Sequence, residues 1–198
     1  MHKKITKEAK IASWVTLLNE SDKGSLLLIA GIVDRMLEQI LNTAIHANLH
    51  NLPQLPNDFE KNLFHTNGGA LHTFSARINV ALAFNLIDHR EYKALHVLKD
   101  LRNEAAHCYF DYSLSDPGVA ARLEELKWYG NGVYREAFLK EEGVKERETS
   151  DRFQFVLRSY GLFMKLAVAQ YEQIRRFKKL TKGVDLPEVP RKELLEND

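Results

Sequence analysis

The sequence predicts an all-α protein, a single-domain bundle of about six or seven helices. Apolar residues recur every three or four positions through most of the chain, which is the period of an amphipathic helix. No segment alternates apolar and polar residues for long enough to form a convincing strand. Composition agrees with this fold class, because 198 residues, 44% of them hydrophobic and 28% charged, suffice for one substantial globular domain.

Helices joined by polar breaks account for the first half of the chain. Apolar spacing predicts three of them: residues 5–19, residues 24–50, and a segment from Leu71 or Thr73 to Phe84. Ser21 and Asp22 are candidate N-caps for the second helix, because short polar side chains satisfy the free N–H groups at a helix start. Residues 57–70 are expected to be irregular, with Asn67-Gly68-Gly69 as the strongest turn signal in the chain.

Capping signals place the next helix. Asn85 is expected to end the preceding helix, and the pair Asp88 and Glu91 predicts a capping box for a helix over about residues 89–108. The segment Ser115-Asp116-Pro117 then indicates an N-cap followed by a first-turn proline. We expect the helix that begins at Pro117 to reach about Trp128, which with Tyr129 is a candidate interaction surface.

The C-terminal part of the chain predicts a charged segment, 133–148, that is partly helical, and one long final helix. Thr149, Ser150 and Asp151 offer caps for this helix, which is expected to end at about Leu180. Its aromatic residues keep helical spacing and are expected in the core: Phe153, Phe155, Tyr160, Phe163 and Phe177. Residues 1–182 are thus expected to form one helical domain, followed by a polar C-terminal tail over residues 183–198.

Composition also limits the function. The formal net charge is +1, which argues against a generally cationic, histone-like surface but leaves room for a local basic patch. The single cysteine, Cys108, excludes an intrachain disulfide and a zinc site made of several thiolates. The longest apolar run, 26–33, is far shorter than the roughly 20 residues of a membrane span. Since no signal peptide is recognisable either, a cytoplasmic location is expected.

No cofactor or metal is expected, because the glycine fingerprints for phosphates and dinucleotides and the H-E-x-x-H motif are absent from the sequence. His46 and His50 are four positions apart on one helix face and could coordinate a metal. No carboxylate accompanies them on that face, so a polar helix end is the favoured interpretation.

The chemically most informative segment is 101–107, which reads Leu-Arg-Asn-Glu-Ala-Ala-His. On a continuous helix, Asn103 and His107 share one face, whereas Arg102 lies about 140° around the axis from His107. One regular helix therefore does not bring Arg102 and His107 to the same substrate atom, although a frayed helix end or two chains that pool their copies would. Arginine suits phosphate binding and histidine suits proton transfer. The structural alternative, which spacing alone favours, is a hydrogen-bonded Arg-Asn-His cluster that fixes the helix end.

The segment 71–117 resembles the mannitol operon repressor family, whose members share a pattern like S-x-R-I, then L-G-L-I, E-Y and L-R-x-x-x-x-H. Matching residues occur in the same order: Ser75, Arg77, Ile78, Leu86, Ile87, Glu91, Tyr92, Leu101, Arg102 and His107. The chain departs from L-G-L-I in reading Phe84-Asn85-Leu86-Ile87. The resemblance, looser over about 20–175, implies an all-helical regulator that acts through a protein partner or by indirect association with DNA.

A second resemblance overlaps the first. The run from Arg102 to His107 is similar to the R-x4-6-H motif of HEPN domains, all-α modules that include metal-independent endoribonucleases acting as dimers. By this resemblance Arg102 and His107 would be catalytic, Asn103 would support them, and a homodimer would be the active form.

A local basic patch is the candidate for nucleic-acid contact. Residues 172–182 carry a net charge of +4, because five basic residues outweigh the single acid Glu172; the basic residues are Lys182 and four near the expected helix end, Arg175, Arg176, Lys178 and Lys179. The alternative is a solvated helix end whose cations complement the helix dipole. No helix-turn-helix signature is recognisable.

Three functions therefore stay open from the sequence. The leading one is a transcriptional regulator that works through a protein partner, and the rival is a HEPN-like endoribonuclease. An immunity or antitoxin-like binding module, which would form a stable stoichiometric complex without activity of its own, is the third.

Overall fold

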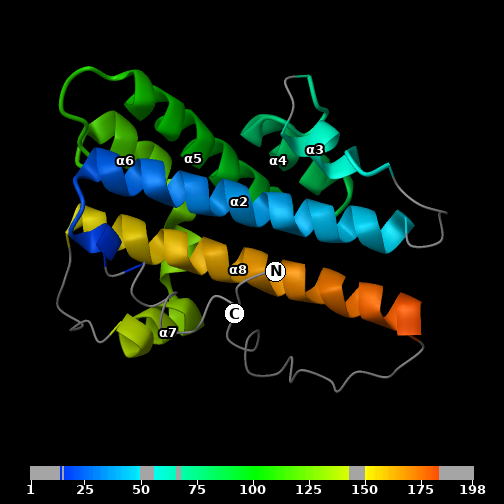
Figure 1. The fold of residues 1–198 in the computed structure, drawn as a ribbon. Helices are drawn as coiled ribbons and strands as arrows, with labels where there is room; N and C mark the ends of the chain where they lie inside the picture. The colour runs from blue at the N-terminus through cyan, green and yellow to red at the C-terminus, as the bar shows by residue number, and fades with distance from the viewer. Residues whose placement is uncertain (1–13, 15, 50–55, 66–67, 143–149, 183–198) are drawn as a thin grey trace. The chain divides into compact units, whose positions relative to one another are not determined.

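The computed structural model describes residues 14, 16–49, 56–65, 68–142 and 150–182, and Figure 1 shows their arrangement as a ribbon. Within these residues the chain is helical and no strand is present, which confirms the predicted all-α class. The elements follow one another as α2 (Asp22–Leu49), α3 (Phe59–Phe64), α4 (Phe74–Ala83), α5 (His89–His107), α6 (Pro117–Leu123), the 3-10 helix η1 (Glu124–Gly130), α7 (Gly132–Glu142) and α8 (Asp151–Lys182).

Contacts within the chain group these elements into two compact units, and α2, α5 and α8 contribute residues to both. Unit 1 comprises Met1–Ile32 and Val97–Met164, and unit 2 comprises Val33–His96 and Lys165–Asp198. Among the described helices, none has the length and apolar character that crossing a membrane requires.

Unit 1 is built around a cluster of aromatic rings. The Phe138 ring of α7 packs edge-on against Phe153 and Tyr160 of α8, at centroid distances of 5.9 and 5.2 Å. The Trp14 ring lies 5.5 Å from the same Tyr160 ring. The predicted core position of the α8 aromatic residues is thus confirmed for Phe153, Phe155 and Tyr160, all of which are buried.

Unit 2 is held by apolar side chains of α2, α4, α5 and α8. Fully buried examples from these four helices are Leu37, Ile78, Leu95 and Leu166. Their spacing follows the helical period that the sequence shows, because burying one stripe of each amphipathic helix removes its apolar surface from water.

The predicted caps are present at four helix starts. Ser21 and Ser150 accept hydrogen bonds from the N–H groups of Gly24 and Phe153 at the start of α2 and α8. Asp116 caps α6, whose first residue is a proline. These bonds satisfy N–H groups that have no partner inside the helix.

The fourth cap is reciprocal, as predicted for a capping box. The Asp88 side chain accepts from the N–H of Glu91 at 2.9 Å, and the Glu91 carboxylate accepts from the N–H of Asp88 at 2.6 Å. Because Glu91 is 4% exposed, burial raises the pKa of its carboxyl group, and the hydrogen bond from the Asp88 backbone opposes that rise.

The turn between α4 and α5 places Asn85 in the left-handed backbone region. Asn85 has φ of +55°, and the N–H groups of Asn85 and Leu86 donate to the carbonyls of Leu82 and Ala81. This is the Schellman arrangement that ends many helices, and its left-handed residue is usually glycine and sometimes asparagine.

Two expectations about helix bounds need correction. Residues 57–70 are not irregular throughout, because Phe59–Phe64 forms α3 and buries Phe64; six residues are fewer than two turns, too short to show a helical period. The helix expected to reach Trp128 ends as an α-helix at Leu123 and continues as η1, a tighter form common at helix ends. The expected helix 5–19, residues 143–148 and the tail 183–198 lie largely or wholly outside the described residues.

Candidate functional site

The last two turns of α5, in unit 1, carry the residues that the sequence singled out. Leu101 and Ala105 are completely buried and fix the inward face of the helix. Arg102, Asn103 and His107 consequently face outward, and all three are exposed. These side chains are accessible to a partner or substrate.

The expected cluster of arginine, asparagine and histidine forms only in part. The Arg102 guanidinium donates to the Asn103 side-chain oxygen at 3.0 Å. No hydrogen bond from another described residue reaches the His107 ring. The structure therefore joins Arg102 to Asn103 and leaves His107 apart, as the angular separation on one regular helix requires.

An ion pair borders this surface. Arg122 of α6 donates to the Glu104 carboxylate at 2.6 Å, so the acid next to Asn103 is neutralised by a neighbouring helix. Close by, burial and the charge of Glu104 raise the pKa of Tyr112 to about 12. The Tyr112 phenol therefore stays protonated at neutral pH and does not serve as a base there.

Two aromatic side chains that were not predicted from the sequence are the most exposed feature of this surface. Tyr109 and Phe110, which follow α5 directly, are 99% and 85% exposed. The signal available in the sequence was two successive aromatic residues outside any amphipathic stripe, immediately after a predicted helix end. Trp128, for which a surface role was expected, is 59% exposed, whereas its neighbour Tyr129 is buried.

A pocket of about 420 Å³ lies elsewhere in unit 1. It is lined by Leu18, Asp22, Ser115 and the first residues of α8. The Asp22 and Arg152 side chains that line it bind each other at 2.7 Å. The three predicted catalytic residues are not among its lining residues, so the pocket and the end of α5 are separate features.

The predicted nucleic-acid patch lies on the final turns of α8, in unit 2. Arg176, Lys178 and Lys179 are exposed and Arg175 is half-buried. At 100° per residue the four positions span about 160° of the helix circumference. The exposed Glu172 lies within that arc, three and four residues before the two arginines, and reduces the positive charge available to a phosphate.

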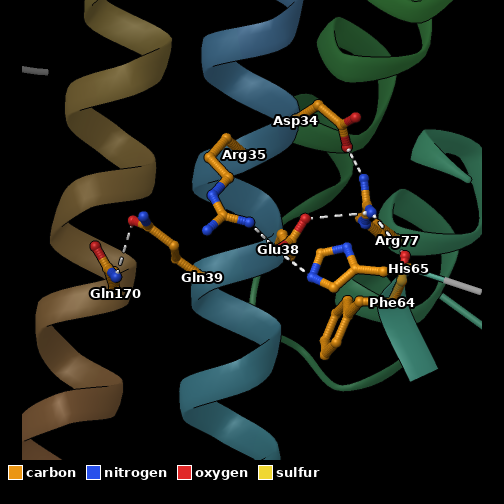
Figure 2. A network of polar contacts seen from close by, with 8 residues as sticks. All are labelled: Asp34, Arg35, Glu38, Gln39, Phe64, His65, Arg77 and Gln170. Carbon is orange, nitrogen blue, oxygen red and sulfur yellow. Dashed lines mark hydrogen bonds and ion pairs between the residues drawn. The ribbon is translucent and has the colours of Figure 1, made fainter. Parts of the chain in front are cut away.

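Unit 2 also contains a charge network around the buried Arg77, shown in Figure 2. Arg77 of α4 is 6% exposed and binds two acids of α2, Asp34 at 2.7 Å and Glu38 at 3.2 Å. Glu38 also contacts Arg35 and lies 3.6 Å from the His65 ring. Every charged group in the network thus has an opposite charge beside it, which is typical of a structural role for buried ions.

The histidine pair considered as a metal site is described only in part. The His46 ring lies 2.6 Å from the Glu60 carboxylate of α3, so a carboxylate is present, although it comes from a different helix. His50 lies outside the described residues. Within the part of the chain that the structure describes, no group of three or more histidine, cysteine, aspartate or glutamate side chains could hold a metal ion.

Comparison with known proteins adds no assignment: no family model, no curated protein and no solved structure matches this chain.

Proposed function

We propose that the chain is a transcriptional regulator of the kind represented by the mannitol operon repressor family, acting through a protein partner or by indirect association with DNA. The observation that carries the proposal is the position of the shared residues. In unit 2, the buried Arg77 is the centre of the charge network, Ile78 is fully buried, and Glu91 completes the capping box of α5.

Three residues of the shared pattern, Arg77, Ile78 and Glu91, therefore hold the scaffold together, whereas Arg102 and His107 of the same pattern are exposed. Asn85 in the left-handed conformation supports the same interpretation, because it meets the backbone requirement of the family glycine. A pattern that determines the scaffold supports a common fold, and the regulatory role is proposed by analogy with the family that shares the pattern.

Partner isolation and DNA binding test the proposal together. A tagged chain is used to isolate stoichiometric partners, and a gel shift is measured with promoter DNA at several salt concentrations. We expect a defined protein partner, DNA binding that weakens as salt rises, or both. A chain that isolates no stoichiometric partner and shifts no promoter DNA would contradict the regulator.

A second candidate, the metal-independent endoribonuclease, is favoured by one observation. Arg102 and His107 are both exposed, so RNA has access to them. Because the two side chains make no contact within one chain, this activity requires a second copy of the protein. RNA cleavage by the wild type, compared with Arg102→Ala and His107→Ala, tests it. Equal cleavage by all three proteins would remove the nuclease from consideration.

A further inference from the structure

The loop that follows α5, Cys108–Leu114, is held at both ends by the first turn of α2. The Lys23 ammonium donates to the Cys108 carbonyl at 2.7 Å, and the Leu114 N–H donates to the Asp22 carboxylate at 2.9 Å. Leu114 is 1% exposed and packs into unit 1. Between these anchors, the Cys108 thiol donates to the Phe110 carbonyl at 3.4 Å. The loop is thus tied to the scaffold and has a defined conformation.

Within this anchored loop, Tyr109 and Phe110 point away from the protein. Burying a large apolar side chain is favourable, so two adjacent aromatic rings that are 99% and 85% exposed are unusual in a loop of fixed conformation. The same loop buries Leu114 and half-buries Tyr112, which shows that apolar space is available to it. Exposed aromatic pairs on a rigid scaffold are typical of contact surfaces.

We infer that Tyr109 and Phe110 are anchors that insert into an apolar groove on a protein partner. This inference rests on the proposed regulator and names the surface through which it binds. Aromatic side chains on a preformed loop lose little conformational entropy on binding, and such residues dominate the binding energy of many interfaces.

The charges around the loop favour a protein over a nucleic acid. The positive charge of the exposed Arg102 is offset by the negative charge of the exposed Asp111. Glu104 is paired with Arg122 at 2.6 Å. The surface therefore has no excess of positive charge, which binding of a phosphate backbone requires.

The apolar area favours a groove on another protein over a second copy of this chain. Two aromatic rings offer about 400 Å² together. A stable symmetric dimer buries about 800 Å² per partner, whereas two anchors in a groove can suffice for a transient regulatory contact.

Peptide selection tests the inference even while the natural partner is unidentified. A phage-displayed library of random dodecapeptides is selected on the full chain, and synthetic copies of the enriched peptides are titrated by fluorescence polarisation. The principal variant is Tyr109→Ser/Phe110→Ser. The matched control is Phe84→Ser, which removes an aromatic side chain that is 59% exposed in unit 2. Lys23→Met tests the anchoring, because it removes the hydrogen bond to Cys108 and leaves both rings in place.

We expect enriched peptides rich in apolar residues, whose affinity falls at least about tenfold in the double variant and stays unchanged in Phe84→Ser. Lys23→Met should weaken binding by a smaller factor, since the rings remain but are less well positioned. Circular dichroism of each variant checks that the helical fold is retained.

Several results would overturn the inference. One is a selection that enriches no peptide, and another is a set of peptides that bind the double variant within about twofold of their affinity for the wild type. A third is binding of oligouridylate RNA by the wild type that is lost in the double variant. A wild-type dimer that the double variant dissociates in sedimentation would also overturn it, because the occupant would then be a second copy. If peptides fail while deletion of the gene still alters transcription, only the surface is wrong. If peptides bind while transcription is unaffected, the regulator fails and the surface stands.

Discussion

Replacing Arg77 with methionine should destabilise the fold more than any surface substitution. The Arg77 side chain is 7% exposed and neutralises Asp34 and Glu38 of α2 at the same time (Figure 2). Methionine keeps much of the volume but removes the charge, so two carboxylates lose their shared partner. The hydrogen bond from Arg77 to the Phe64 carbonyl is lost as well.

The magnitude follows from the exposure of the two acids. Removing one partner of a buried ion pair typically costs about 3–5 kcal/mol. Glu38 is 12% exposed but keeps Arg35 beside it, and Asp34 is 28% exposed and therefore partly hydrated. These two conditions place the expected loss at the lower end, about 3 kcal/mol of unfolding free energy, which is a large part of the stability of a typical domain.

Urea unfolding monitored by circular dichroism measures this loss directly. Glu38→Gln and the double variant Arg77→Met/Glu38→Gln complete a double-mutant cycle. The double variant should be more stable than the sum of the two single losses predicts, because it no longer leaves the Glu38 charge without Arg77. A loss below about 1 kcal/mol for Arg77→Met, or strictly additive losses, would refute the role assigned to the network.

Three further predictions concern single positions. A Cβ at Gly161 would lie 1.8 Å from the Tyr129 carbonyl oxygen, so Gly161→Ala should lower the free energy of unfolding by about 3 kcal/mol or more. The exposed Gly31 of α2 has open space around it, so Gly31→Ala should raise that free energy by about 0.5–1 kcal/mol. Comparable melting temperatures for the two variants would contradict this pair of expectations. Asn85→Ala should cost about 1 kcal/mol, because alanine disfavours φ of +55°, and Asn85→Gly should be neutral or stabilising in the same urea assay. Burial raises the pKa of the Glu91 carboxyl group above its ordinary value of 4.5, so the folded chain binds the carboxyl proton more tightly than the unfolded chain does. The wild type should therefore lose stability relative to Glu91→Gln as the pH rises above 4.5. A stability difference between the two proteins that is independent of pH would contradict this expectation.

The parts of the fold that could be predicted from the sequence are those that depend on neighbouring residues. Helical spacing gave the bounds of α2, α5 and α8 to within a few residues, and caps such as Ser150 and the pair Asp88 and Glu91 need only a separation of three positions. The divergence of Arg102 and His107 was predictable for the same reason, since it follows from the geometry of one helix.

The features that escaped prediction depend on distant contacts or on exposure. Arg77 and Asp34 are 43 residues apart, and no local pattern pairs them. The exposure of Tyr109 and Phe110 contradicts the usual preference of aromatic residues for the interior. Their loop is anchored by Lys23, which is 85 residues before Cys108, so no local pattern indicates this contact either.

The measurement that tests the regulator most directly is a transcriptome comparison in the cell that encodes the chain. The gene is deleted and then complemented with the wild type, with Arg102→Ala/His107→Ala, or with Tyr109→Ser/Phe110→Ser. A regulator that binds a partner through the aromatic loop predicts changed initiation at a limited set of promoters, restored by the first two proteins and not by the third. Failure of Arg102→Ala/His107→Ala to restore those transcripts, together with internal RNA 5′ ends that only the wild type produces, would contradict the regulator and identify a nuclease.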